Sequence, residues 1–87
     1  MSKFEVEGFK NYSNIKEIID GSSQKDVLQK IIKKHNISAK KLVKMTNKVN
    51  QVYLDNGLDP SSVIDFVITN LESDNPITSI GNWHIEM

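Results

Sequence analysis

The sequence predicts a mainly α-helical protein: a small domain of three to four helices that spans residues 1–87, with a short two-stranded ribbon at the termini as an option. Three observations indicate this class. Apolar residues recur at helical spacing through most of residues 24–71. Serine or aspartate precedes the longer of these segments, as helix-capping residues do. The chain of 87 residues is long enough for one modest hydrophobic core.

The first two helices are expected at 14–20 and 24–35. In the first, Asn14 and Glu17 have the spacing of a capping box. In the second, Ser23 is the expected N-cap, and the apolar residues recur on one face. This face, which should pack on the core, consists of Val27, Leu28, Ile31 and Ile32.

Residues 39–56 have the clearest helical pattern, between a capping Ser38 and a terminating Gly57. On a helical wheel the charged side chains fall on one arc, and the apolar arc covers about half of the circumference. A helix of this kind is usually central and covered on two sides. The polar arc consists of Lys40, Lys41, Lys44, Asn47, Lys48, Gln51 and Asp55.

A fourth helix is expected to begin at Asp59 and Pro60 and to end at 74–76. Aspartate is a favoured N-cap, and proline is tolerated at the first helical position because its missing N–H has no partner there. The wide apolar faces of this helix and of 39–56 need cover, so a homodimer is an open alternative. The inner face of the fourth helix would consist of Val63, Ile64, Phe66, Val67, Ile68 and Leu71.

The two ends of the chain have a different period. Phe4 and Val6 alternate with charged residues within 3–9, and Trp83 and Ile85 alternate with polar residues near the other end. This alternation is typical of a half-buried strand. The termini could therefore pair as a two-stranded ribbon that packs on the helices.

The formal net charge is zero, but the charges are unevenly distributed. Residues 25–48 contain eight lysines and one acid, a net charge of +7, whereas residues 49–87 contain six acids and no lysine. The chain has no arginine, which excludes the bidentate recognition of guanine or phosphate that arginine provides. The basic middle of the chain predicts an acidic macromolecular partner, either a protein or a nucleic acid.

A lysine-rich helical face is the main candidate binding surface. Lys40, Lys44 and Lys48 stand at i, i+4 and i+8 in the helix expected over 39–56. No acid interrupts this row, whereas a face that serves solubility alone usually mixes both signs. A solvent-exposed face without a partner is the alternative. The predicted binding residues are Lys30, Lys33, Lys34, Lys40, Lys41, Lys44 and Lys48.

The segment 27–57 permits a second interpretation, with helices at Ser38–Met45 and Asn50–Asn56 on either side of a turn. In this form it resembles the start of phage-repressor (Cro-type) domains. The resemblance implies a DNA-binding transcriptional regulator with a helix-turn-helix in about 24–57. The turn is longer than that family's, and the second helix lacks arginine. The residues that the resemblance places at the DNA are Asn50 and Gln51 at base edges and Lys48 at a phosphate.

Catalysis has little support in the sequence. No recognisable cluster of catalytic or metal-binding residues surrounds His35 or His84, and the chain has no glycine-rich phosphate loop. The absence of cysteine excludes disulfides and thiolate metal sites. We therefore expect no catalytic residue, no metal and no cofactor. Trp83 is a candidate interface anchor, with burial in the core as the alternative.

These observations predict a non-enzymatic small regulatory or inhibitory protein. It would dock on a macromolecular partner through its lysine-rich helical face, in the manner of phage or mobile-element accessory proteins. A DNA-binding regulator is the alternative. No segment has the length of a membrane span, and the N-terminus lacks a signal-peptide core, so we expect a cytoplasmic protein without membrane contact.

Overall fold

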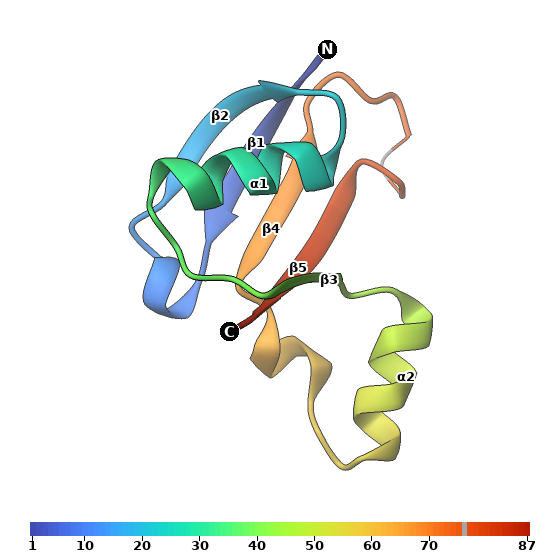
Figure 1. Ribbon diagram of the computed structural model, residues 1–87. Coiled ribbons are helices and arrows are strands. Elements are labelled where there is room, and N and C mark those ends of the chain that lie inside the picture. The colour runs from blue at the N-terminus through green and yellow to red at the C-terminus, as the bar shows by residue number, and fades with distance from the viewer. Residues whose placement is uncertain (76) are drawn as a thin grey trace.

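Five strands form one antiparallel sheet in the computed structural model, which describes residues 1–75 and 77–87 (Figure 1). The order across the sheet is β2-β1-β4-β5-β3. The strands are β1 (Ser2–Gly8), β2 (Lys16–Gly21), β3 (Lys41–Lys44), β4 (Phe66–Asn70) and β5 (Ile80–Glu86). The described residues also form the helices α1 (Gln24–Lys34) and α2 (Asn47–Asp55) and the 3₁₀ helices η1 (Lys10–Tyr12) and η2 (Pro60–Val63). The fold is therefore α/β, and the predicted mainly α-helical domain is wrong.

Helix α1 lies across one face of the sheet, over β2, β1 and β4 (Figure 1). Its inward side chains Val27, Leu28 and Ile31 are fully buried. They meet the strand side chains that point to the same face, because alternate residues of a strand share a face. The core residues outside the helix are Phe4, Val6, Ile15, Phe66, Ile68, Trp83 and Ile85.

The strands predicted at the two ends of the chain are present. β1 buries Phe4 and Val6, and β5 buries Trp83 and Ile85. The two strands do not pair with each other, because β4 lies between them and pairs with both. The predicted ribbon of the two termini is therefore wrong, although each half of it is a strand.

The helix predicted at 14–20 is also wrong, since this part of the chain forms β2. Ile19 lies opposite Phe4 in the antiparallel register with β1. Two adjacent β-branched residues, Ile18 and Ile19, favour a strand over a helix. The hairpin partner β1 then supplies backbone hydrogen bonds, whereas a helix of about two turns is too short to be stable by itself.

Helix α1 has its predicted position and its predicted cap. The side chain of Ser23 accepts a hydrogen bond from the backbone N–H of Asp26 at 3.1 Å. This interaction satisfies one of the N–H groups that have no partner in the first turn of a helix. The local sequence signal and the structure agree here because capping involves residues only three positions apart.

Residues 39–56, predicted as one central helix, divide into β3 and α2. Leu42 lies opposite Ile85 and Val43 opposite His84 in the pairing of β3 with β5. Leu42 and Val43 suit a strand as well as a helix, so the helical wheel could not distinguish the two. The choice depends on β5, a strand about forty residues away in the sequence.

The helix-turn-helix predicted in about 24–57 is wrong for the same reason, because its first helix, at Ser38–Met45, contains β3. Helix α2 begins only after Thr46, whose side chain accepts a hydrogen bond from the N–H of Val49 at 3.3 Å. The predicted stop is correct, since Gly57 has a positive φ of 74° after the end of α2.

The fourth predicted helix is wrong beyond its first turn. Asp59 accepts a hydrogen bond from the backbone N–H of Ser61 at 3.0 Å, and Pro60 begins η2, so the predicted cap does form. The chain then becomes extended, and Phe66–Asn70 is the central strand β4. The predicted end of this helix at 74–76 includes Pro76, which lies outside the described residues.

Helix α2 is little covered by the rest of the molecule. None of its residues is buried, and the side chain of Leu54 is 56% exposed. With η2 it projects beyond the end of the sheet (Figure 1). The segment that the sequence predicted as central is thus peripheral.

We expect Leu28→Ala to lower the free energy of unfolding by about 2–5 kcal/mol, because it leaves a cavity in the core. Leu54→Ala, the same change on α2, should alter it by less than about 0.5 kcal/mol. Urea denaturation of both variants measures these values. In the predicted helical domain Leu54 would be a core residue. A large loss of unfolding free energy for Leu54→Ala would therefore contradict the observed fold, in which this side chain is exposed.

Candidate functional site

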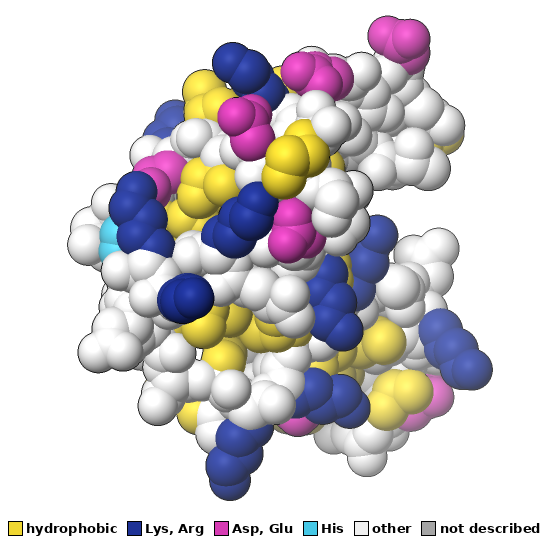
Figure 2. Space-filling view, turned by 45° about the horizontal axis from the view of Figure 1, so that its top comes forward, with side chains coloured by type: hydrophobic (Ala, Val, Ile, Leu, Met, Phe, Trp, Pro, Cys, Tyr) yellow, Lys and Arg dark blue, Asp and Glu magenta, His cyan; other side chains and the backbone are white. Residues whose placement is uncertain are grey.

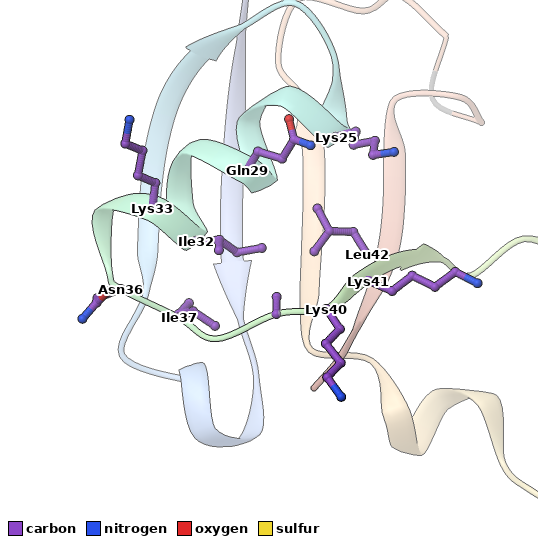
Figure 3. Close-up of a pocket in the computed structure, with 10 residues that line it drawn as sticks. Lys25, Gln29, Ile32, Lys33, Asn36, Ile37, Lys40, Lys41 and Leu42 are labelled. Atoms are coloured by element: carbon purple, nitrogen blue, oxygen red, sulfur yellow. The ribbon is translucent and has the colours of Figure 1, made fainter.

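A groove of about 580 Å³ separates α1 from the chain that leads into β3 (Figure 3). Its floor is aliphatic and consists of Ile32, Ile37 and Leu42. Lysines stand on both walls around this floor. They are Lys25 and Lys33 on α1, and Lys40 and Lys41 on the opposite wall. We call this site the lysine-rimmed groove; Gln29, Asn36 and Ala39 complete its lining.

Helical periodicity builds the first wall. Lys25, Gln29 and Lys33 are four residues apart, so they form a row along α1 at the margin of the groove. The side chain of Lys33 points outward, whereas that of Ile32 points toward Leu42 (Figure 3). The burial of Leu28 and Ile31 in the core determines on which side of the helix this row lies. The first wall therefore follows from the same periodicity that packs α1 on the sheet.

The second wall exists because α1 covers only part of the sheet. Helix α1 contacts β2, β1 and β4, whereas β3 is the edge strand beyond β5. Ile37 and Leu42 pack against the margin of the core and are only partly buried. Their remaining apolar surface faces the groove.

The lysine-rimmed groove combines positive charge with accessible apolar surface. None of the ten residues that the structure shows along its walls and floor is acidic. The space-filling view shows lysine side chains around a hydrophobic patch on this side of the molecule (Figure 2). Such a site attracts a negatively charged ligand and covers apolar groups of the same ligand.

Two of the predicted binding lysines lie outside the groove and interact with acidic residues or backbone. Lys30 donates a hydrogen bond to the backbone oxygen of Asp20 at 2.9 Å and lies 3.4 Å from the carboxylate of Asp26. Lys34 forms an ion pair with Glu17. Both interactions are on the β2 side of α1. The predicted continuous lysine face is therefore divided, and its members within the groove are Lys33, Lys40 and Lys41.

The other predicted site residues are dispersed. Lys44 borders a second hollow, of about 410 Å³, beside the N-terminus of α1. Lys48 is exposed in the first turn of α2. Gln51 donates from its side-chain amide to Asp55 at 2.8 Å, and Asn50 on the same helix is half-buried. The structure does not bring these four residues together in one site.

Trp83, the predicted interface anchor, is 5% exposed and belongs to the core. Its indole N–H donates a hydrogen bond to the side-chain oxygen of Gln24 at 3.1 Å. Burial was the alternative interpretation of this residue, and its alternation with His84 and Glu86 is that of a strand. Trp83 joins β5 to the start of α1 and is not exposed as an anchor would be.

A buried carboxylate joins η2 to β5. Asp65 accepts a hydrogen bond from the N–H of Ile85 at 2.8 Å and lies 3.0 Å from Nδ1 of His84. The same Nδ1 is 2.8 Å from the backbone oxygen of Val63. A carbonyl oxygen only accepts hydrogen bonds, so Nδ1 carries the proton. These hydrogen bonds tie the end of η2 and the residue before β4 to β5.

An ion-pair cluster fastens the C-terminal end of α1 to β2. Glu17 interacts with Lys34 and with Nε2 of His35. The hydrogen bond from Lys34 and, next in size, that from His35 lower the pKa of the Glu17 carboxyl below its ordinary value. The cluster pairs Lys34 with an acid on this side of α1, whereas the lining of the groove on the other side contains lysines and no described acid.

The sequence analysis did not identify Lys25, Gln29 or the aliphatic floor as parts of a site. The row of Lys25, Gln29 and Lys33 was visible on the helical wheel of 24–35, since the helix itself was correctly predicted. The position of Ile37 is local, because its N–H donates to the backbone oxygen of Ile32 at 2.9 Å after Asn36, whose φ is 54°. Leu42 had no such signal, because it faces α1 only after β3 has paired with β5.

Comparisons of the chain with models of protein families, with curated proteins and with solved structures find no match. Within residues 1–75 and 77–87, no group of histidine and acidic side chains is arranged to hold a metal ion. No helix in this part of the chain is long and apolar enough to cross a membrane. A proposal about the function must therefore start from the geometry and charge of the groove.

Replacement of Glu17 by glutamine should lower stability at neutral pH. A carboxyl whose pKa is lowered in the folded state stabilises that state above its ordinary value of 4.5, and this contribution is lost as the pH falls through the folded pKa. The difference in Tm between wild type and Glu17→Gln should thus be largest near neutral pH and shrink below pH 4.5. Thermal denaturation across this range measures it, with Glu72→Gln at an exposed position as the control. A difference independent of pH would contradict the stabilising role of the cluster.

Proposed function

We propose that this protein is a small non-enzymatic regulatory or inhibitory protein that binds an acidic segment of a partner protein in the lysine-rimmed groove. One observation carries the proposal. The groove combines an aliphatic floor with four lysines, and no described lining residue is acidic. A ligand that complements both properties has carboxylates and apolar side chains close together, as an acidic protein segment does.

The aliphatic floor favours a protein segment over a nucleic acid. Ile32, Ile37 and Leu42 can cover apolar side chains of a partner, which contributes about 25 cal/mol for each Å² of apolar surface removed from water. A phosphate backbone would contact the lysines and leave the floor exposed. Unpaired bases stack on aromatic side chains, and none of the described lining residues is aromatic.

The lysines contribute selectivity more than affinity. An exposed ion pair stabilises a complex by only about 0.2–1 kcal/mol, because both groups lose hydration and side-chain freedom. Several lysines acting on one segment increase its rate of association and disfavour basic segments. The affinity then depends mainly on the apolar side chains that fill the floor. A partner segment with acids alone would leave this floor empty.

Selection of random linear peptides on the immobilised protein tests this proposal. We expect the selected peptides to be acidic and to contain aliphatic or aromatic residues. The variant Lys33→Glu with Lys40→Glu should bind them at least about tenfold more weakly, since it reverses two rim charges. The matched variant Lys10→Glu with Lys48→Glu has the same net charge, but its changes lie outside the groove, so it should bind within about twofold of wild type.

Selected peptides without an excess of acids, or equal losses in the two variants, would overturn the proposal. Mixed-sequence duplex DNA, titrated at two salt concentrations, is the second probe. If the protein selects no acidic peptide but binds the duplex, and loses that binding in the Lys33→Glu and Lys40→Glu variant, the partner is a nucleic acid and the proposed partner class is wrong.

A further inference from the structure

The lysine-rimmed groove runs along the edge of β3 and not over a face of the sheet. Four consecutive residues, Ala39, Lys40, Lys41 and Leu42, line it. Successive side chains of an extended chain point to opposite faces. Ala39 and Lys40 precede β3, but Lys41 and Leu42 are adjacent within it. Since their side chains point to opposite faces, a groove that both border follows the edge of the strand. β3 is the last strand of the sheet, with β5 as its neighbour on one side.

The backbone N–H and C=O groups of Leu42 lie on the free edge of the sheet. In an antiparallel pair, only alternate residues exchange hydrogen bonds with the partner strand. Met45 donates its N–H to Asn82 at 2.8 Å, while the N–H of Ile85, opposite Leu42, donates to Asp65 on the β4 side. Leu42 therefore belongs to the set of β3 residues whose N–H and C=O groups face away from β5.

The opposite edge of the sheet is occupied. At β2, Lys30 donates a hydrogen bond to the backbone oxygen of Asp20 at 2.9 Å, and Lys34 and His35 bind Glu17. Charged side chains from α1 thus cover the β2 edge, as proteins commonly do to block further strand pairing. At β3 the groove leaves the edge open, so the two edges are not equivalent.

We infer that the partner segment adds to the sheet as a sixth strand along β3, with aliphatic and acidic residues in alternation; the inference rests on the proposed function. Backbone hydrogen bonds to Leu42 and its neighbours would align the segment. One alternate set of its side chains would point to the α1 face and cover the aliphatic floor, and the other would point to the opposite face, where Lys41 lies. A segment opposite the whole of β3 would be about 13 Å long, at about 3.3 Å per residue.

A synthetic peptide in which glutamate and valine alternate is the probe. Bound at saturation, it should slow the hydrogen exchange of the Leu42 amide, measured by NMR, by at least about tenfold. Methylation of the peptide nitrogens at one alternate set of positions should weaken binding at least about tenfold, and methylation of the other set should leave it nearly unchanged. A peptide of the same composition, with all glutamates before all valines, should bind more weakly than the alternating one.

Binding that leaves the Leu42 amide unprotected, or that responds equally to both sets of methylations, would overturn strand addition. It would leave the groove as the site, provided that the lysine variants still lose binding. Failure of the random-peptide selection would instead remove the proposed function and the strand with it. Protection of Leu42 in the free protein that increases with concentration would assign the edge to a second copy of the chain, which also overturns the inference.

Discussion

The position of β4 between β1 and β5 is the constraint on which the rest of the structure depends. β4 pairs with Val6 of β1 on one side and with Trp83 of β5 on the other, and so joins the two ends of the chain in one sheet. Its Phe66 and Ile68 are fully buried beneath α1. The ring of Tyr12 stacks on Phe66 with 5.0 Å between ring centroids. Without this strand, α1 would have no continuous surface to cover and β3 no sheet to border.

The groove forms because one helix is narrower than a sheet of five strands. Neighbouring strands lie about 4.8 Å apart, and a helix with its side chains is about 10 Å wide. One helix therefore covers two or three strands, and α1 does so over β2, β1 and β4. On the same face, the far side of the sheet is left with a partly exposed Leu42 and an open strand edge. The groove forms there because α2 projects beyond the end of the sheet and does not fill this space (Figure 1).

The distribution of acids around α1 makes this space positive in a protein without net charge. On the β2 side, Glu17 and Asp26 form ion pairs with Lys34 and Lys30. On the β3 side, Lys25, Lys33, Lys40 and Lys41 border the groove, and none of its described lining residues is acidic. Ion pairs thus hold one side of α1 near β2, and the charged residues that line the groove beside the other side are all lysines.

The sequence by itself determined the features whose partners are a few residues apart. These are the Ser23 cap, the Asp59 cap, the stop at Gly57 and the alternation within β1. It also placed Lys33 on the polar side of a correctly predicted helix. Only the tertiary structure decided that 39–56 would divide into β3 and α2, that the apolar run after η2 would be a strand, and that Leu42 would face Ile32 across the groove. Caps and periodicity depend on local hydrogen bonds and local geometry. Strand pairing depends on segments far apart in the chain, and an apolar run such as Phe66–Ile68 fits either a helix or a strand until its neighbours are in place.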